Sequence, residues 1–306
     1  MTNMRKFINR NKTTFAITTL MLPGALWLLL IRYIPMAGIV IAFQDYRPHP
    51  PNPTLLNNII NSRWVGFDNF RFMFASADAW RMIRNTLAYN AVFIVLTMVF
   101  AVAFAIMLNE LTKKFMAKLY QTLMFFPFVI SWVVVSYFVF AFLAPTYGLL
   151  AENTNWYMDS TLWPLILTSA NLWKTVGYSC IMYLVAITSI DTTQYEAASI
   201  DGATKWQQVW NVTIPHIKPM IVILLILSAG RIFNADFGLF YNVTLDSGPL
   251  YPVTDVVDTY VFRALQRLNN IGMSTAAGLF QNVVGFICIM LVNGIVRKLE
   301  PDHALF

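Results

Sequence analysis

Charged residues are scarce in this chain. Asp, Glu, Lys and Arg together make up 12% of its 306 residues, whereas hydrophobic residues make up 58%. A soluble globular protein carries about 25% charged residues. The length alone would accommodate two soluble domains, but this composition predicts an integral membrane protein instead.

Cysteine and histidine are also scarce. Cys180 and Cys288 both lie in apolar runs, which predicts neither a disulfide framework nor a metal site. His49, His216 and His303 are far apart in the sequence and form no motif with the spacing of metal ligands. We therefore expect no metal-binding residues in this chain.

Motifs for nucleic-acid binding and for ATP hydrolysis are absent. The net charge is +6, but the basic residues are dispersed and no basic stripe with stacking aromatic residues is present. No nucleic-acid partner is therefore expected. The chain also lacks the glycine-rich phosphate loop that ends in Gly-Lys-Ser or Gly-Lys-Thr. We therefore do not expect the chain itself to be an ATPase.

Six apolar segments are long enough to cross a membrane. They cover roughly residues 15–43, 82–108, 119–143, 162–187, 217–233 and 273–296. About 20 apolar residues span a bilayer as a helix. The first segment is longer, and we expect Pro35 to kink it. Its basic start resembles a signal peptide, but no cleavage site follows, so we interpret it as an uncleaved span. The predicted fold is an all-α membrane protein with six transmembrane helices in one domain, residues 1–306.

Basic residues predict how these spans are oriented, because Lys and Arg near spans tend to stay in the cytoplasm. The tail before the first span carries four basic residues and no acid, and Lys113, Lys114 and Lys118 follow the second span. The loop 144–161 has two acids and no basic residue. We therefore expect both termini, and the stretch 191–215, in the cytoplasm.

Two long loops are then expected outside the cell, over residues 44–81 and 236–270. The second contains TDVVDTYVFRALQ, where Val257, Tyr260, Val261 and Ala264 lie on one helical face. Apolar residues at this spacing predict an amphipathic helix.

The stretch EAASIDGATKWQQVWNVTIP, residues 196–215, is polar compared with its surroundings. Asp191 and Thr193 just before it are candidate N-caps, and Thr193 with Glu196 has the spacing of a capping box. We predict a first helix over residues 194–200.

The second half of this stretch predicts a turn and another helix. Gly202 lies where a helix commonly ends in a left-handed residue, and the second helix, residues 204–212, is predicted to stop before Pro215. Trp206 and Trp210 would suit a hairpin lying in the lipid headgroup layer. The alternative is a docking element for a cytoplasmic protein, and the two interpretations are compatible.

The same stretch resembles the signature loop of binding-protein-dependent ABC importer permeases. The matching pattern is Glu196-Ala197-Ala198, three residues, Gly202, nine residues and then Val212-Thr213-Ile214-Pro215, with Val212 and Ile214 as mild departures. In that family the loop is a coupling helix that seats in the ATP-hydrolysing subunit. The resemblance implies an ATPase-coupling role for Glu196, Ala197, Ala198, Asp201, Gly202 and Pro215.

Four further stretches extend the resemblance over nearly the whole chain. YIPMAGIVIAFQDY, WVGFDNF, GRIFNADFGLFYNVT and TDVVDTYVFRALQ are similar to a branch of the maltose-type carbohydrate uptake family that imports polysaccharide-derived oligosaccharides. The resemblance implies a multi-pass protein of the bacterial plasma membrane. It also implies four kinds of partner: a second, different permease, two ATP-binding subunits, an extracytoplasmic solute-binding protein and an oligosaccharide. ATP and magnesium would belong to the ATPase subunits, and this chain would bind no cofactor.

Polar residues within spans usually face a bundle interior or a cavity, and here they define a candidate substrate path. The path residues are Asn171, Trp173, Lys174 and Tyr178 in the fourth span, Arg231, Asn234 and Asp236 at the outer end of the fifth, and Asn282 in the sixth. Asn171, Lys174 and Tyr178 share one helical face. Sugar recognition needs amides and charges beside flat aromatic faces, which this group supplies.

Structural roles remain open for the same residues. Arg231 can pair with Asp236 and lock helix ends, and Lys174 can extend its ammonium group toward the membrane surface. Arg32, in the first span, can likewise either face the substrate path or have a purely structural role.

Two other functions compete with an ATP-driven importer. An ion-coupled secondary sugar transporter needs acids within its spans or broken helices that coordinate ions, and none of the six predicted spans contains an acid. An intramembrane enzyme needs a catalytic or metal constellation within the spans, and the sequence contains no such motif.

Overall fold

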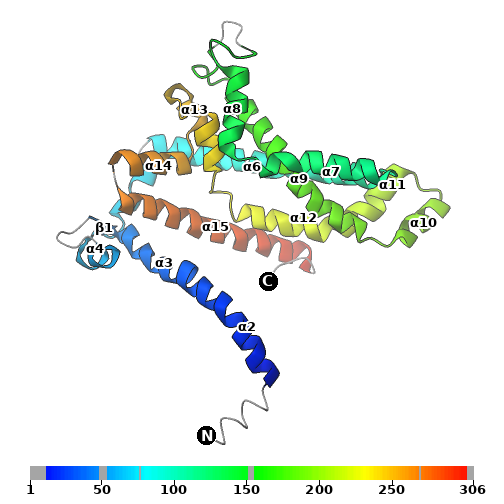
Figure 1. The fold of residues 1–306 in the computed structure, drawn as a ribbon, viewed down its shortest axis with the longest axis horizontal. Coiled ribbons are helices and arrows are strands. Elements are labelled where there is room, and N and C mark those ends of the chain that lie inside the picture. The colour runs from blue at the N-terminus through cyan, green and yellow to red at the C-terminus, as the bar shows by residue number, and fades with distance from the viewer. Residues whose placement is uncertain (1–11, 48–53, 76, 151–154, 269, 302–306) are drawn as a thin grey trace, which may run out of the picture. The chain divides into compact units, whose positions relative to one another are not determined.

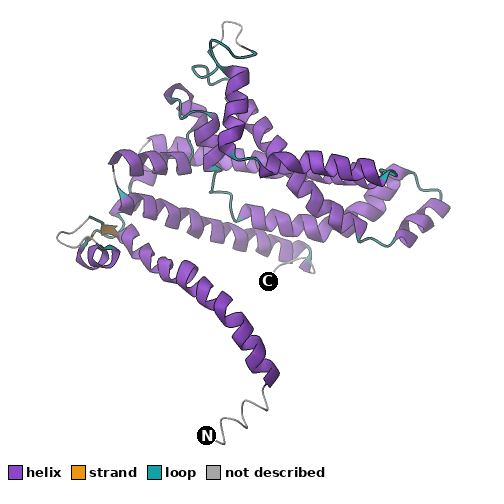
Figure 2. Cartoon of the chain, viewed as in Figure 1, coloured by secondary structure: helices purple, strands orange, loops and turns teal. Residues whose placement is uncertain are grey.

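The computed structural model describes residues 12–47, 54–75, 77–150, 155–268 and 270–301. Within these ranges the chain is almost entirely helical, with one two-stranded sheet (Figure 2). The helices are α2 (Lys12–Leu28), α3 (Ile34–Met36), α4 (Leu55–Asn61), α5 (Phe72–Ala75), α6 (Ala77–Asn109), α7 (Lys114–Val129), α8 (Trp132–Leu143), α9 (Trp163–Thr188), α10 (Thr192–Ile200), α11 (Lys205–Gln208), α12 (Ile214–Ala229), α13 (Tyr251–Thr254), α14 (Val257–Leu268) and α15 (Ile271–Leu299). The predicted all-α class is confirmed.

Several of these helices are long and apolar enough to cross a membrane. In the described part of the chain, four continuous segments qualify: 16–43, 78–109, 205–229 and 271–299. Two bent pairs, α7 with α8 and α9 with α10, raise the number to as many as six. The predicted number of spans is therefore confirmed, whereas the placement of the termini in the cytoplasm stays a prediction.

The chain divides into two compact units. The first comprises residues 1–71 and 269–279, and the second comprises residues 72–268 and 280–306. The assignment of the whole chain to one domain stays a prediction. The residues that matter for function lie mainly in the second unit.

In the first unit, a small two-stranded sheet follows the first span. β1 (Gln44–Asp45) pairs antiparallel with β2 (Arg63–Trp64). The Asn69 amide donates to the carbonyls of Ala42 and Gln44, at 3.0 and 2.9 Å. These bonds fix the end of the span to the segment that follows it.

The predicted third span, 119–143, is not one straight helix. α7 ends at Val129, α8 begins at Trp132, and the two helices are bent by 97°. Ser131 caps α8, because its hydroxyl accepts a hydrogen bond from the Val134 amide. An N-cap of this kind starts a new helix and satisfies one of its orphan N–H groups.

Two prolines in the spans follow the same local pattern. A π-helical stretch, Leu29–Tyr33, precedes Pro35, and another, Val209–Thr213, precedes Pro215. Proline lacks an N–H and its ring crowds the carbonyl four residues earlier. A π-turn widens the helix and shifts its hydrogen bonds to the fifth residue. The helix therefore accommodates the proline and continues through it.

One hydrophobic core of the second unit lies where α6, α9 and α12 pack together, and α6 and α9 run side by side (Figure 1). Ala101 and Ala105 on α6 are fully buried, so the two backbones can approach closely. Gly177 on α9 has the same effect on α7, since an added Cβ would lie 1.8 Å from the Met124 carbonyl oxygen.

α14 is attached to α6 by polar contacts as well as apolar ones. The predicted helix is confirmed, and Val257 packs with Ala79 and Met82. The Asn85 amide donates to the Asp255 carbonyl at 3.1 Å. Arg263 on α14 forms ion pairs with Asp255 and with Asp246, the latter at 2.7 Å.

Candidate coupling loop and substrate path

The first arm of the stretch 191–215 is α10. Asp191 is its N-cap, and the Asp191 carboxylate accepts a hydrogen bond from the Thr193 amide at 3.0 Å. This bond lowers the pKa of Asp191. The predicted capping box of Thr193 with Glu196 is therefore wrong, because Asp191 caps the helix instead. α10 begins at Thr192, two residues before the predicted start.

The turn after α10 has the predicted left-handed glycine. Gly202 has a φ of +78°, and the Ala203 amide donates to the Ala198 carbonyl at 2.9 Å. This bond closes the end of the helix as a Schellman motif does. No atom lies within 4 Å of the position a Gly202 Cβ would occupy. The turn therefore depends on backbone conformation and has room for a side chain.

The second arm begins with a capping box at Thr204. The Thr204 amide donates to the Gln207 side chain at 2.7 Å, and the Gln207 amide donates to the Thr204 hydroxyl at 3.4 Å. The predicted stop before Pro215 is wrong. α11 continues through the π-helical stretch Val209–Thr213 into α12, with Pro215 in the first turn of α12. The arm is thus one end of the span 205–229.

Polar contacts hold the two arms together as what we call the hairpin, residues 191–215. Gln208 is buried, and its amide donates to the Ser199 hydroxyl at 2.9 Å and to the Ala203 carbonyl at 3.3 Å. The Tyr195 and Thr213 hydroxyls are 2.9 Å apart. These contacts fix the angle between the arms.

One ion pair attaches the hairpin to the end of α6. Lys205 lies 3.0 Å from Glu110, and both side chains are largely exposed. A small cavity of about 260 Å³ lies between Asn109–Thr112, Tyr195 and Lys205. The hairpin is therefore in contact with the end of α6 as well as being continuous with α12.

The predicted coupling residues lie together on the hairpin. Glu196, Ala197, Asp201 and Gly202 are exposed, and Ala198 is partly buried. Trp206 and Trp210 are also exposed and pack edge to face, with ring centroids 5.7 Å apart. The hairpin thus offers a face of small and polar residues, which suits docking to a cytoplasmic protein. It also offers an apolar aromatic face, which suits the lipid headgroup layer.

Lys174 is buried, and its hydrogen bonds are to backbone carbonyls. Its ammonium donates to the carbonyls of Pro127, Phe128 and Ile130, with the first two bonds at 3.2 and 3.0 Å. The last carbonyls of a helix have no partner within the helix and form its negative end. Lysine has three N–H donors, so Lys174 satisfies the end of α7 at the break. The interpretation in which Lys174 extends toward the membrane surface is wrong.

The neighbouring candidates on α9 divide between the interior and the surface. Asn171 is buried, whereas Trp173 and Tyr178 are exposed. The Tyr178 ring stacks on Phe128, with ring centroids 4.6 Å apart. Tyr178 and Lys174 therefore both contact the α7 end of the break.

Asp236 does not pair with Arg231. Its carboxylate accepts hydrogen bonds from the Trp132 indole at 2.6 Å and from the Gly238 amide at 3.0 Å. Within the described ranges, Arg231 forms no ion pair and is exposed. The predicted pair is therefore wrong, and Asp236 joins the start of α8 to the helical turn Gly238–Val243.

The remaining candidates lie at the surface. Asn234, Asn282 and Arg32 are all exposed. Gln281, beside Asn282, is buried and donates to the Phe233 carbonyl at 2.8 Å and to the Asp258 carboxylate at 3.0 Å. Their place in a substrate path stays a prediction.

Two features of this region were not foreseen from the sequence. The break between α7 and α8 places Trp132 beside Asp236 and Lys174, and the Trp132 ring lies 5.3 Å from the Lys174 ammonium. Pro127 with Ser131 is the signal that could have revealed it. The second feature is the burial of Arg263 between Asp255 and Asp246. Its partners are eight and seventeen residues away, so no short motif marks it.

Comparison with known proteins decides the family. The profile described as "Binding-protein-dependent transport system inner membrane component" matches residues 94–302. The chain belongs to this family. The permease is thus a multi-pass protein of the inner membrane and a component of a binding-protein-dependent ABC sugar importer.

Curated relatives cover nearly the whole permease. It is 32% identical to Protein LplB of Bacillus subtilis (strain 168), over 92% of this chain and 89% of that protein. It is 34% identical to the polygalacturonan/rhamnogalacturonan transport system permease protein YteP of the same organism, over 92% of this chain and 88% of that protein. The expected resemblance to carbohydrate permeases is confirmed.

A solved structure agrees with this fold over nearly its full length. The permease matches a chain of a bacterial ABC transporter involved in the import of the acidic polysaccharide alginate, with a TM-score of 0.81 and 30% identity. The match covers 97% of this chain and 99% of that chain. A second structure of a bacterial alginate transporter, which includes a periplasmic protein with bound alginate pentasaccharide, also has a TM-score of 0.81.

Proposed function

We propose that the permease forms half of the pathway of an ATP-driven oligosaccharide importer. A second, different permease would form the other half, two ATP-binding subunits would supply the energy, and an extracytoplasmic binding protein would deliver the sugar. ATP and magnesium would bind to the ATPase subunits, and this chain would bind no cofactor.

The hairpin is the observation that supports ATP coupling. Its internal contacts, from Gln208 to Ser199 and from Tyr195 to Thr213, fix the angle between its arms. Its second arm continues without interruption into the span 205–229. A force on the exposed residues Glu196 to Gly202 would therefore be transmitted to a spanning helix. Rigid elements in contact are the physical means by which such coupling travels.

Support for an oligosaccharide substrate comes from similar proteins. YteP is named for the transport of polygalacturonan and rhamnogalacturonan, and the matched solved structures are named for alginate. These are polymers or fragments of polymers, so a relative of their permeases is expected to import short chains of sugar units. The ion-coupled alternative finds no support in these relatives, and neither does an enzymatic role.

The test is uptake of radiolabelled oligosaccharide into vesicles that contain the purified subunits. We expect uptake only with ATP, the ATPase, the binding protein and both permeases. Uptake that follows an ion gradient and needs no ATP would overturn the proposal. Uptake without the second permease would contradict the two-permease arrangement alone.

A further inference from the structure

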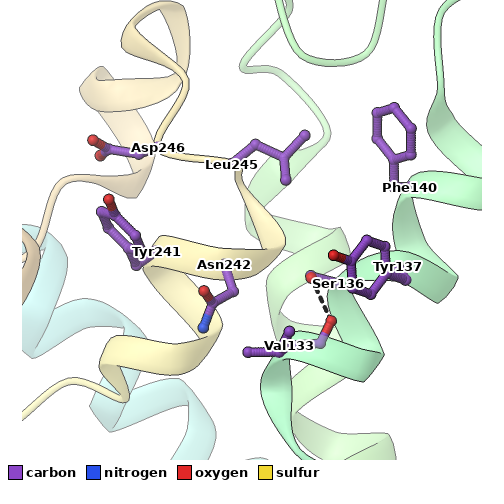
Figure 3. A pocket seen from close by; sticks show the side chains of 8 residues that line it. All are labelled: Val133, Ser136, Tyr137, Phe140, Tyr241, Asn242, Leu245 and Asp246. Carbon is purple, nitrogen blue, oxygen red and sulfur yellow. Dashed lines mark hydrogen bonds between the residues drawn. The ribbon is translucent and has the colours of Figure 1, made fainter.

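A cavity of about 390 Å³ lies outside the predicted substrate path. Four of its lining residues come from α8, two from the helical turn Gly238–Val243 and two from the residues just after that turn: Val133, Ser136, Tyr137, Phe140, Tyr241, Asn242, Leu245 and Asp246 (Figure 3). Its size lies within the range of small-ligand pockets, roughly 300–1,000 Å³. It can therefore hold part of an oligosaccharide.

One wall of this cavity has an unusual backbone. Leu245 and Asp246 have φ values of 55° and 48°, in the left-handed region. Non-glycine residues rarely adopt this conformation, and residues held in it cluster at ligand sites. Arg263 donates to the Asp246 carboxylate at 2.7 Å, and the Tyr251 hydroxyl donates to the Asp246 carbonyl at 3.3 Å. These bonds hold the wall in place.

The aromatic rings around the cavity are oriented by contacts that need no ligand. Tyr241 stacks on Phe237 with centroids 4.8 Å apart, and its ring meets Phe262 edge to face at 5.0 Å. On the other wall, Trp132 at the start of α8 is bonded to Asp236. Both walls are thus anchored at a common base, which preorganises the site.

Polar groups in the cavity lack partners. The Asn242 amide and the hydroxyls of Tyr137 and Tyr241 form no hydrogen bond with another described residue. Aromatic faces beside uncommitted amide and hydroxyl groups match the alternating apolar and hydroxyl surface of a sugar ring. A lipid acyl chain would leave these polar groups without partners.

The cavity has no positive charge to receive an acidic sugar. None of its lining residues is Lys, Arg or His. Its one charged residue, Asp246, points away from α8 (Figure 3), and its carboxylate accepts a hydrogen bond from Arg263. A carboxylate that entered would lose its hydration without gaining a counter-ion, which costs free energy.

We propose that this cavity is a carbohydrate subsite that takes an uncharged sugar unit and disfavours a uronate at that position. The proposal rests on the proposed import of oligosaccharides and adds a preference for one class of sugar unit. The experiment must distinguish a bound sugar from two other occupants: a lipid, or an apolar side chain of a partner subunit.

The test compares galactotriose with trigalacturonate, which differ by oxidation of C6 from a hydroxymethyl group to a carboxylate. The importer complex, purified through the permease and placed in lipid nanodiscs without binding protein, is titrated with each sugar by calorimetry. We expect galactotriose to bind at least about tenfold more tightly. Trigalacturonate binding that is equal or tighter would overturn the preference for an uncharged unit.

Three variants locate the binding. We expect Tyr137→Ala to weaken galactotriose binding by about tenfold through loss of an aromatic contact. Tyr147→Ala is the matched control, because Tyr147 is 92% exposed and outside the cavity, and it should bind as wild type does. Asn242→Lys adds a cation and should raise trigalacturonate affinity. Equal binding by the Tyr137 and Tyr147 variants would overturn the subsite and leave lipid or a partner as the occupant.

Uptake is then measured in the same complex with binding protein and ATP restored. This measurement distinguishes a failure of the carbohydrate subsite from a failure of the proposed oligosaccharide import. ATP-driven uptake that persists with an unchanged KM in Tyr137→Ala overturns only the subsite. A wild-type complex that takes up no oligosaccharide with ATP overturns the proposed function, and the calorimetric comparison still decides whether the cavity binds sugar.

Discussion

The hairpin and the break between α7 and α8 are built from different kinds of contact. In the hairpin, the bonds join residues close in sequence: Asp191 with Thr193, Gln208 with Ser199, and Tyr195 with Thr213. At the break, Lys174 bonds to Ile130, 44 residues away, and Trp132 bonds to Asp236, 104 residues away. The hairpin therefore forms from local sequence, whereas the break needs three spans to be assembled first.

This difference has a consequence for mutation. A local element can change its conformation while the remaining helices stay packed. A buried long-range contact cannot be removed without leaving groups unsatisfied in several helices. We therefore expect changes at the break to affect assembly, and changes in the hairpin to affect coupling.

The largest effect is expected for Lys174→Met. Methionine is similar in length but removes the ammonium that donates to the carbonyls of Pro127, Phe128 and Ile130. The Pro127 carbonyl still accepts from the Ile130 amide, whereas the partly buried carbonyls of Phe128 and Ile130 lose this donor, at a cost of about 1–3 kcal/mol for each group left unsatisfied. We expect loss of the assembled complex in size-exclusion chromatography, and an equal fall in uptake and basal ATPase activity.

Lys118→Met is the matched control, because the Lys118 side chain is exposed. It should assemble normally. If the Lys174→Met complex instead assembles with normal basal ATPase and loses only uptake, Lys174 belongs to the substrate path.

The next effect is expected for Gly202→Leu. The space around Gly202 is open, so the cost arises from the left-handed backbone, about 1–2 kcal/mol. We expect a folded complex in which ATPase stimulation by the loaded binding protein falls by about tenfold. Gly202→Asn should retain most of the stimulation, since Asn tolerates this conformation. Equal stimulation in the Leu variant and in wild type would remove the coupling role.

A pair of smaller changes sharpens the comparison. Trp132→Phe removes one donor to Asp236 at the break, and Gln208→Leu removes the donors that join the hairpin arms. Each lost bond is worth about 1 kcal/mol. We expect the Trp132 variant to lower the thermal unfolding midpoint of the complex and the Gln208 variant to lower mainly the stimulated ATPase. The reverse pattern would contradict the distinction between the two regions.

The smallest effect is expected for Asp258→Asn. Burial raises the pKa of Asp258 above its ordinary value of 3.8, although hydrogen bonds from Ala235 and Gln281 oppose this rise. The folded state thus binds the proton more tightly than the unfolded state, and its stability falls as pH rises through the folded pKa. We expect the stability of wild type relative to the Asn variant to decrease as the pH rises above about 4. An increase measured by denaturant unfolding would contradict this assignment.

Periodicity and local patterns predicted much of the fold. The apolar runs located the spans, and the left-handed Gly202 followed from its place after a short helix. Proline was harder to interpret. Pro215 predicted a helix end, but a π-turn before it lets the helix continue.

The contacts of the candidate path could not be predicted from spacing. The sequence shows that Lys174 and Tyr178 share a face of α9, but not that the end of α7 lies against that face. The same limit applies to Asp236, whose partner is Trp132 rather than the nearby Arg231. Polar side chains in a membrane protein take the partners that packing brings to them, and these are distant in sequence.

The central claim is that the exposed side of the hairpin contacts the ATPase. The most direct measurement is cross-linking of Ala197→Cys to that subunit, in a complex whose Cys180 and Cys288 have been replaced. We predict an adduct with the ATPase that blocks ATP-driven uptake, with Tyr147→Cys giving none. An Ala197→Cys adduct no stronger than that of Tyr147→Cys, in a complex that still transports, would contradict the claim.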